Sequence, residues 1–285
     1  MKRKEVILTI DDAPSGDFRN KVDFLHSKNI TGIFFFIGKK LKKDRYALKY
    51  AVEKGQVIGN HSYQHKHYSD LSIQRCKDDI LEAHELITGT LAELKQPPCQ
   101  YFRFPYGDKA DYKYGRIFQS FKEAYSSRPL TKTGKILSRL KRKGKDHDYL
   151  KAKGDHKKMV IQEFLRQLGY LPLDHPSLKY DFYQPLRRDY DCSWTLDSMD
   201  WMLKRSLPGE QMATEQKILR RFLMTNPPDG RGEIPGPYGM RFLGSSEVIL
   251  VHDYDETHLT FQKIVNLLEG QHVKFVNPQV LTRDR

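Results

Sequence analysis

Residues 6–14, Val-Ile-Leu-Thr-Ile-Asp-Asp-Ala-Pro, decide how this chain folds and where its chemistry lies. The apolar stretch 6–10 predicts a buried β-strand, and Asp11 and Asp12 follow it directly, before a Pro-Ser-Gly turn. Neighbouring strand residues point to opposite sides, so one carboxylate can hold a metal ion while the other, turned away slightly, acts as a base. Taken alone, such a pair more often is solvated or caps a helix, and further residues must support the catalytic interpretation.

Two histidines provide the first such support. His61 and His65 lie in the stretch His-Ser-Tyr-Gln-His, which follows the short apolar segment 56–59. At this spacing the two imidazoles converge on one face of a helical turn, and with Asp12 they form a two-histidine, one-carboxylate set that leaves positions open for water. The alternatives are a pair of surface histidines, or a ligand role for the nearby His67.

Three more polar clusters each follow an apolar, strand-like stretch. They are Arg-Phe-Pro-Tyr-Gly at 103–107, Asp-Ser-Met-Asp-Trp at 197–201, and His-Asp at 252–253. An arginine at position 103 is suited to fix a catalytic carboxylate by a bidentate contact. Functional groups gather at the carboxyl ends of the strands in barrels built of parallel strands, so the clusters predict one shared site.

Strand-like and helix-like segments alternate along the chain. This alternation predicts parallel strands in a barrel or an open sheet, and we find no internal repeat. The predicted strands are 6–10, 31–37, 56–59, 100–102, 192–196, 247–251 and 272–276, and the predicted helices are 18–29, 46–54, 72–94, 159–168, 214–224 and 258–269.

Composition points to a globular protein. A chain of 285 residues with 38% apolar and 30% charged residues can bury a substantial core, and it fits one large α/β domain. No apolar stretch is long enough to cross a bilayer. Met1 leads straight into the first strand, so we expect a cytoplasmic protein if Met1 is native, and otherwise an exported one whose signal has been removed. Cys76, Cys99 and Cys192 are widely spaced and predict buried free thiols.

Positive charge is concentrated in one region. Residues 109–158 hold 16 Lys and Arg against 5 Asp and Glu, a net charge of +11 out of +13 for the whole chain. Its centre is Lys141, Arg142, Lys143 and Lys145. The region is interpreted either as a solvated loop or as an arm that attracts an anionic polymer, a lipid surface or nucleic acid. No zinc-finger or aromatic RNA-binding motif accompanies it.

The five clusters, in this order, resemble the five motifs of the polysaccharide deacetylases, the NodB-homology group or carbohydrate esterase family four. The similarity covers residues 5–107 and 192–280, with Ile10 where the family usually has Phe and Ala13 where it usually has Gly. We expect these two substitutions to affect how the substrate fits more than the chemistry of the neighbouring carboxylates. The resemblance implies a single domain over 1–285, a distorted (β/α) barrel of about seven parallel strands, with a basic insertion inside 108–191.

The resemblance also implies a role for each motif residue. Asp12, His61 and His65 would hold one divalent ion, for which zinc is favoured and cobalt or nickel are alternatives. Asp11 would be the general base and His252 the general acid. The remaining assignments are Arg103 to orient Asp11, Asp200 to pair with His252, the backbone amide of Tyr106 to hold the oxyanion, and Trp201, Leu250 and Pro105 to contact substrate.

The sequence therefore predicts a metal-dependent hydrolase that removes N-acetyl groups from amino sugars in a peptidoglycan-like or chitin-like glycan. One alternative is hydrolysis of a small amide or cyclic imide on the same fold. A second is a polyanion-binding protein that uses the basic insertion. Asp11→Asn should abolish function in the first two cases, and loss of the basic stretch should abolish it in the third.

Overall fold

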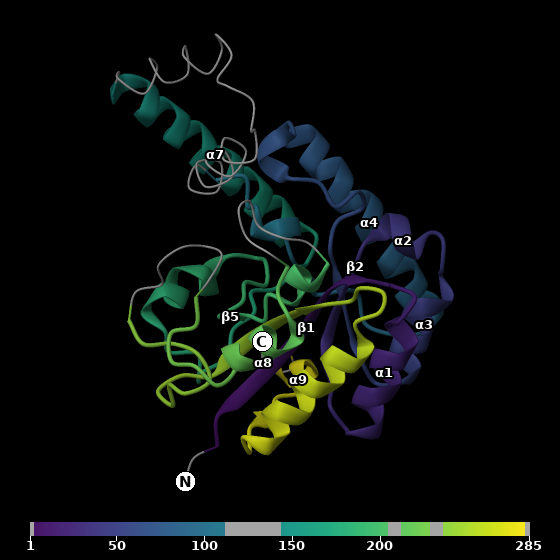
Figure 1. Cartoon of the computed structure of the whole chain (residues 1–285). Helices are drawn as coiled ribbons and strands as arrows, with labels where there is room; N and C mark the ends of the chain where they lie inside the picture. The colour runs from purple at the N-terminus through teal and green to yellow at the C-terminus, as the bar shows by residue number, and fades with distance from the viewer. Residues whose placement is uncertain (1–2, 112–143, 205–211, 229–235, 283–285) are drawn as a thin grey trace.

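The protein has an α/β fold around a seven-stranded parallel sheet (Figure 1). The computed structural model describes residues 3–111, 144–204, 212–228 and 236–282. The hydrogen-bonded strand order is β4-β3-β2-β1-β6-β5, and β7 pairs with the start of β1. The strands are β1 (Glu5–Ala13), β2 (Ile33–Phe36), β3 (Val57–Asn60), β4 (Tyr101–Phe102), β5 (Leu196–Asp197), β6 (Glu247–His252) and β7 (Lys274–Phe275).

Helices pack against one another around the outside of the sheet. In the described chain, α8 contacts α9, α9 contacts α1, α1 contacts α3, α3 contacts α4, and α4 contacts α7. The helices are α1 (Phe18–Ser27), α2 (Gly38–Leu41), α3 (Tyr46–Glu53), α4 (Ile73–Glu93), α7 (Gly144–Gln167), α8 (Glu215–Arg221) and α9 (His258–Gly270).

The side chains of β1 alternate between two hydrophobic cores. Leu8 and Ile10 pack with the helices, whereas Ile7 belongs to a second core on the inner face of the sheet. Thr9 and Asp11 continue the inner series, because alternate residues of a strand share a face. The inner face therefore changes from apolar to polar toward the carboxyl end of β1, which places the polar site at one end of the barrel.

An irregular segment, 192–197, closes the barrel between its two edges. The Cys192 N–H donates to the Phe102 carbonyl on β4 at 2.7 Å, and the Thr195 N–H donates to the Val248 carbonyl on β6 at 2.9 Å. Only the end of the predicted strand 192–196 is regular, as β5, because the segment bonds to different neighbours at its two ends. The predicted fold class, a distorted barrel of parallel strands, is confirmed.

Within segment 108–191, which contains the predicted insertion, a buried ionic cluster ties the two ends of the segment to α7. Lys109 Nζ lies 2.8 Å from Asp189 and 2.9 Å from Asp191, and Gln162 of α7 donates to Asp191 at 2.6 Å. The predicted helix 159–168 is the end of the longer α7, whose charged first half lacks the apolar spacing that would have indicated a helix. Residues 112–143, with three of the four central basic residues of the insertion, lie outside the described residues.

The remaining expectations from composition concern the cysteines and membrane spans. Cys76, Cys99 and Cys192 are all free and buried, as predicted. Burial raises the pKa of Cys76 to about 11 and that of Cys99 to about 12, so both are protonated thiols at neutral pH. Among the described helices, none combines the length and apolar character that a bilayer crossing requires.

Candidate active site

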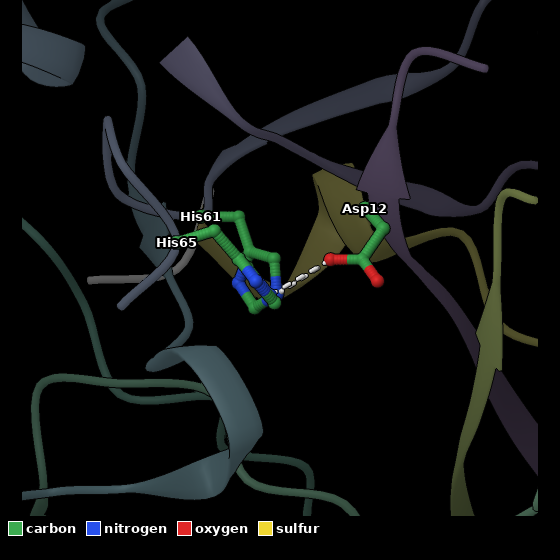
Figure 2. Close-up of side chains that lie close together, drawn as sticks. All are labelled: Asp12, His61 and His65. Carbon is green, nitrogen blue, oxygen red and sulfur yellow. Dashed lines mark ion pairs between the residues drawn. The ribbon is translucent and has the colours of Figure 1, made fainter. Parts of the chain in front are cut away.

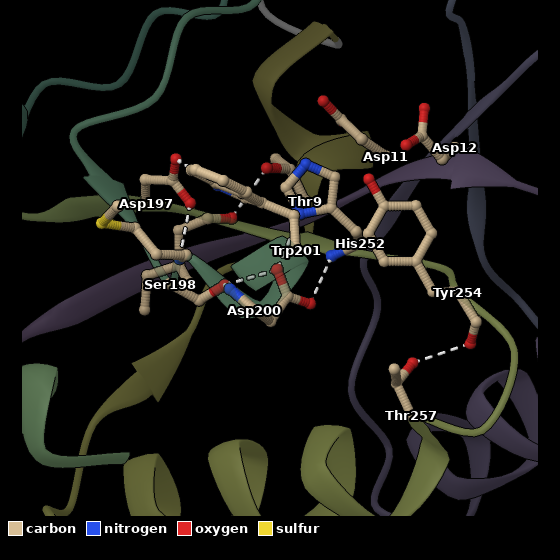
Figure 3. A network of polar contacts seen from close by, with 12 residues as sticks. Thr9, Asp11, Asp12, Asp197, Ser198, Asp200, Trp201, His252, Tyr254 and Thr257 are labelled. Atoms are coloured by element: carbon tan, nitrogen blue, oxygen red, sulfur yellow. Dashed lines mark hydrogen bonds and ion pairs between the residues drawn. The ribbon is translucent and has the colours of Figure 1, made fainter. Parts of the chain in front are cut away.

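Asp11 and Asp12 share one site at the end of β1, although they are neighbours in a strand. The pairing of β1 with β2 shifts register between Ile10 and Ala13, and Asp12 has a left-handed backbone with φ of 68°. Such an irregularity redirects a side chain that strict alternation would send to the opposite face. Strict alternation therefore does not hold here, and the two carboxylates lie side by side in Figure 3.

His61 and His65 come from the end of β3 and the loop after it, not from a helical turn. The predicted helical turn is wrong because Ser62 and His65 both have left-handed backbones, with φ of 65° and 55°. The loop nevertheless brings the imidazoles together with Asp12, and one ligand atom from each of the three residues lies within 4.8 Å of the others. Figure 2 shows both rings turned toward the Asp12 carboxylate.

These three side chains fit a metal ion. Asp12 Oδ1 lies 3.5 Å from His61 Nε2 and 2.9 Å from His65 Nε2, yet this buried oxygen lacks a properly oriented hydrogen-bond donor. The Nδ1 of His61 lies 2.9 Å from the Arg103 carbonyl, which can only accept, so Nδ1 carries the proton and Nε2 presents its lone pair. Two imidazole nitrogens and one carboxylate oxygen form a common donor set of catalytic zinc sites.

Protonation favours the same interpretation. Burial lowers the pKa of His61 to about 4, so its imidazole is neutral near pH 7, as a ligand must be. For Asp12, burial alone would raise the pKa, but His65 and His61 outweigh it and hold the pKa well below the ordinary value. His67 takes no part in the cluster: its Nδ1 lies 3.6 Å from Asp108, and its ring stacks on Tyr106 at 3.9 Å.

Arg103 holds Asp11 through a single hydrogen bond. Its Nη1 donates to Asp11 Oδ1 and to Thr9 Oγ1, both at 2.8 Å, while Nε donates to the Cys192 carbonyl at 2.8 Å. The predicted bidentate contact is wrong, because only Nη1 reaches the carboxylate, while Nε is engaged by the Cys192 carbonyl and Nη2 has no hydrogen-bond partner among the described residues. Asp11 Oδ2 is left on the side of the candidate metal ligands, 3.6 Å from His61 Nε2.

His252 ends β6 and is paired with Asp200. Its Nδ1 lies 2.7 Å from Asp200 Oδ1, and its backbone N–H donates to Asp200 Oδ2 at 2.8 Å. Burial would lower the pKa of His252, but the carboxylate of Asp200 reverses this and raises it to about 9. Ser198 Oγ donates to Asp200 Oδ1 at 2.9 Å, and this contact fixes the orientation of the carboxylate.

The predicted substrate-contacting residues occupy different positions. Leu250 is buried in the inner core and Pro105 is buried, whereas Trp201 is half-buried and donates from Nε1 to Asp197 at 3.4 Å. Tyr106 has a left-handed backbone, φ 59°, an exposed ring, and a ring-centroid distance of 4.6 Å to His65. Their roles toward substrate stay predictions.

Sequence reasoning missed three residues that support the site. Thr9 accepts from Arg103, Lys21 forms a fully buried ion pair with Asp253 at 2.7 Å, and Tyr254 stacks on His252. Lys21 could have been noticed, because it falls on the face of α1 that also carries the buried Phe18, Val22 and Leu25.

Comparison with known proteins supports the resemblance. A family model described as polysaccharide deacetylase matches residues 1–118. A peptidoglycan-N-acetylglucosamine deacetylase of Bacillus cereus is 30% identical over 107 residues, which are 37% of this chain and 38% of that protein. The matched region thus spans well under half of this curated relative.

Solved structures share the fold over nearly the whole chain. A family 4 carbohydrate esterase from Streptomyces lividans, solved with acetate, matches with a TM-score of 0.56 and 18% identity, covering 97% of this chain and 94% of that one. A family 4 pseudoenzyme from Bacillus anthracis matches with a TM-score of 0.54 and 17% identity, covering 96% and 63%. Because the fold occurs with and without native activity, residues of the site must support any activity. Residues 1–118 thus match the polysaccharide deacetylase model, and the chain shares the fold of family 4 carbohydrate esterases.

Proposed function

We propose that this protein is a metal-dependent deacetylase that hydrolyses the N-acetyl groups of amino sugars in a peptidoglycan-like or chitin-like glycan. The observation that carries the proposal is the placement of Asp11 and His252. They are direct partners in the pairing of β1 with β6, next to the cluster of Asp12, His61 and His65. A base and an acid thus stand beside one candidate metal site, as amide hydrolysis requires.

Amide hydrolysis needs an activated water, a stabilised oxyanion and a protonated amine. When bound to Asp12, His61 and His65, a divalent ion supplies Lewis acidity toward the acetyl carbonyl and lowers the pKa of water. Asp11 accepts the proton of the attacking water on Oδ2, because Oδ1 is held by Arg103. The carboxylate is thereby kept in one orientation while it works.

His252 provides the proton for the departing amine. Its Nδ1 is engaged by Asp200, so the proton is delivered from Nε2. With a pKa raised to about 9, the imidazole is cationic at neutral pH and ready to donate. The backbone N–H of Tyr106, in a left-handed turn beside His65, is the proposed donor to the oxyanion, a type of contact worth about 3 to 4 kcal/mol.

The glycan substrate is proposed from the named relatives. The Bacillus cereus protein is called a peptidoglycan-N-acetylglucosamine deacetylase. Residues 1–118, which carry Asp11, Asp12, His61 and His65, match the polysaccharide deacetylase model. Nothing in the described residues favours a small cyclic imide over an acetamido sugar.

The test is release of acetate from chitin oligomers, peptidoglycan fragments and simple acetamides. The protein is stripped with a chelator, then supplied with zinc, cobalt or nickel. We expect metal-dependent acetate release from at least one glycan, and none after Asp11→Asn. No release from any of these substrates, together with tight binding of polyanions, would overturn the proposal in favour of the polyanion-binding alternative.

A further inference from the structure

The ring of Tyr254 lies parallel to the imidazole of His252. The ring centroids are 5.3 Å apart and the planes differ by 7°. Tyr254 belongs to the loop that follows β6, and in Figure 3 its ring stands beside His252 with the hydroxyl directed toward Asp11 and Asp12. One edge of the imidazole is thus held by Asp200 and one face by an aromatic ring.

The backbone of Tyr254 is fixed by two further contacts. Its carbonyl accepts from Lys21 Nζ at 2.8 Å and from Thr257 Oγ1 at 2.7 Å. Lys21 is itself held by the buried carboxylate of Asp253, which also accepts from the Ser15 N–H at 2.7 Å. The tyrosine therefore projects from a loop that is tied to α1 and to the turn after β1.

We propose that Tyr254 is a positioning residue for His252, the general acid of the proposed deacetylation, on which this inference rests. A protonated imidazole is attracted by the face of an aromatic ring whose centroid lies within about 6 Å. The stack also restricts rotation of the imidazole about its bond to Cβ, so that the Nε2 proton stays aimed at the departing nitrogen. The ring of Tyr254 carries this role, and its hydroxyl does not.

Substrates with different leaving groups separate this role from general loss of structure. The leaving group of an acetamido sugar is an amine, which needs the proton of His252. The leaving group of p-nitrophenyl acetate is a stable phenolate, which needs none. Tyr254→Leu should lower kcat for N-acetylated chitin oligomers about tenfold, with KM unchanged, while kcat for the ester stays within about twofold. Tyr254→Phe keeps the ring and should retain the wild-type ratio of amide to ester activity.

His252→Asn provides the benchmark, because it removes the acid itself and should show the same selective loss in stronger form. Equal loss on both substrates by Tyr254→Leu, or no loss on either, would overturn the inference. Selective loss by Tyr254→Phe would also overturn it, since the hydroxyl would then be responsible. If Tyr254→Leu fails to fold, as judged by circular dichroism, Tyr254→Met takes its place. A wild-type protein that cleaves the ester but no acetamide would instead refute the proposed function, and this inference with it.

Discussion

At the scale of single residues, the site contains several residues with left-handed backbones, a conformation that residues other than glycine rarely adopt. Asp12, Ser62, His65, Tyr106 and Met199 are all left-handed, with φ between 55° and 68°, and all lie just beyond or at the end of a strand of the barrel. Non-glycine residues seldom adopt this region, and such conformations concentrate at functional sites. At Asp12 and His65, these conformations accompany side chains that meet in the candidate metal site.

The two adjacent aspartates should behave differently when altered. Asp11→Asn keeps the size of the side chain but removes the proton acceptor, so kcat for acetamide hydrolysis should fall about 10²- to 10⁴-fold. Its zinc affinity, measured by calorimetry, should change little. The matched variant Asp12→Asn should lose zinc binding, because Asp12 lies in the ligand cluster. Equal loss of zinc binding in both would argue against separate roles.

The His252–Asp200 pair predicts a pH limit for activity. His252 must be protonated to act as an acid, and its pKa is raised to about 9, so kcat/KM should fall as the pH rises through about 9. Asp200→Asn removes the charge that raises the pKa, and the fall should move to lower pH. A pH profile of kcat/KM measures both. An unchanged basic limb in Asp200→Asn would contradict the assignment.

At the scale of elements, loops from distant parts of the chain are tied together beneath the site. Lys21 of α1 and Asp253 after β6 form an ion pair with both side chains fully buried, and Ser15 after β1 joins it. The pair thereby links the turn that follows Asp12 to the loop that carries Tyr254. Because both side chains are buried, loss of one partner leaves the other as an unpaired charge inside the protein.

Lys21→Met should therefore destabilise the fold by about 3 kcal/mol, measured as the free energy of unfolding in urea. The control is Lys28→Met, whose partner Glu269 is about one-third exposed, so that its loss should cost less than about 1 kcal/mol. Equal, small effects of the two variants would show that the buried pair contributes little.

The elements themselves were largely predictable, and their irregularities were not. Six of the strands and the long helix α4 follow from apolar periodicity, because burial of one face leaves that pattern in the sequence. The bulge at Asp12, the loop at 61–65 and the irregular segment 192–197 leave no such pattern. They depend on hydrogen bonds to distant residues, such as Arg103 to the Cys192 carbonyl.

At the scale of the whole molecule, the five sequence clusters meet at one end of the barrel, as expected from the rule that parallel strands carry their sites at the carboxyl ends. The identities of the candidate ligands, base and acid could be predicted from the family resemblance. Of their supports, Lys21 could have been noticed on the apolar face of α1, whereas Thr9 and Tyr254 have no distinctive local sequence.

The basic insertion offers a test of the alternative that the protein acts by binding polyanions. Replacing Lys141, Arg142, Lys143 and Lys145 by glutamine removes four of the thirteen net positive charges. We expect acetate release from neutral chitin oligomers to stay within about twofold of wild type, because the change removes long-range attraction and no site residue. Loss of all acetate release would contradict this expectation and show that these basic residues are needed for hydrolysis.

A crystal structure of the zinc-loaded protein, with anomalous data at the zinc edge, tests the proposed metal site most sharply. We expect one strong peak between Asp12, His61 and His65, with ligand distances of about 2.0 to 2.2 Å. Zinc bound only elsewhere on the protein, or no peak at these three side chains, would contradict the proposed site.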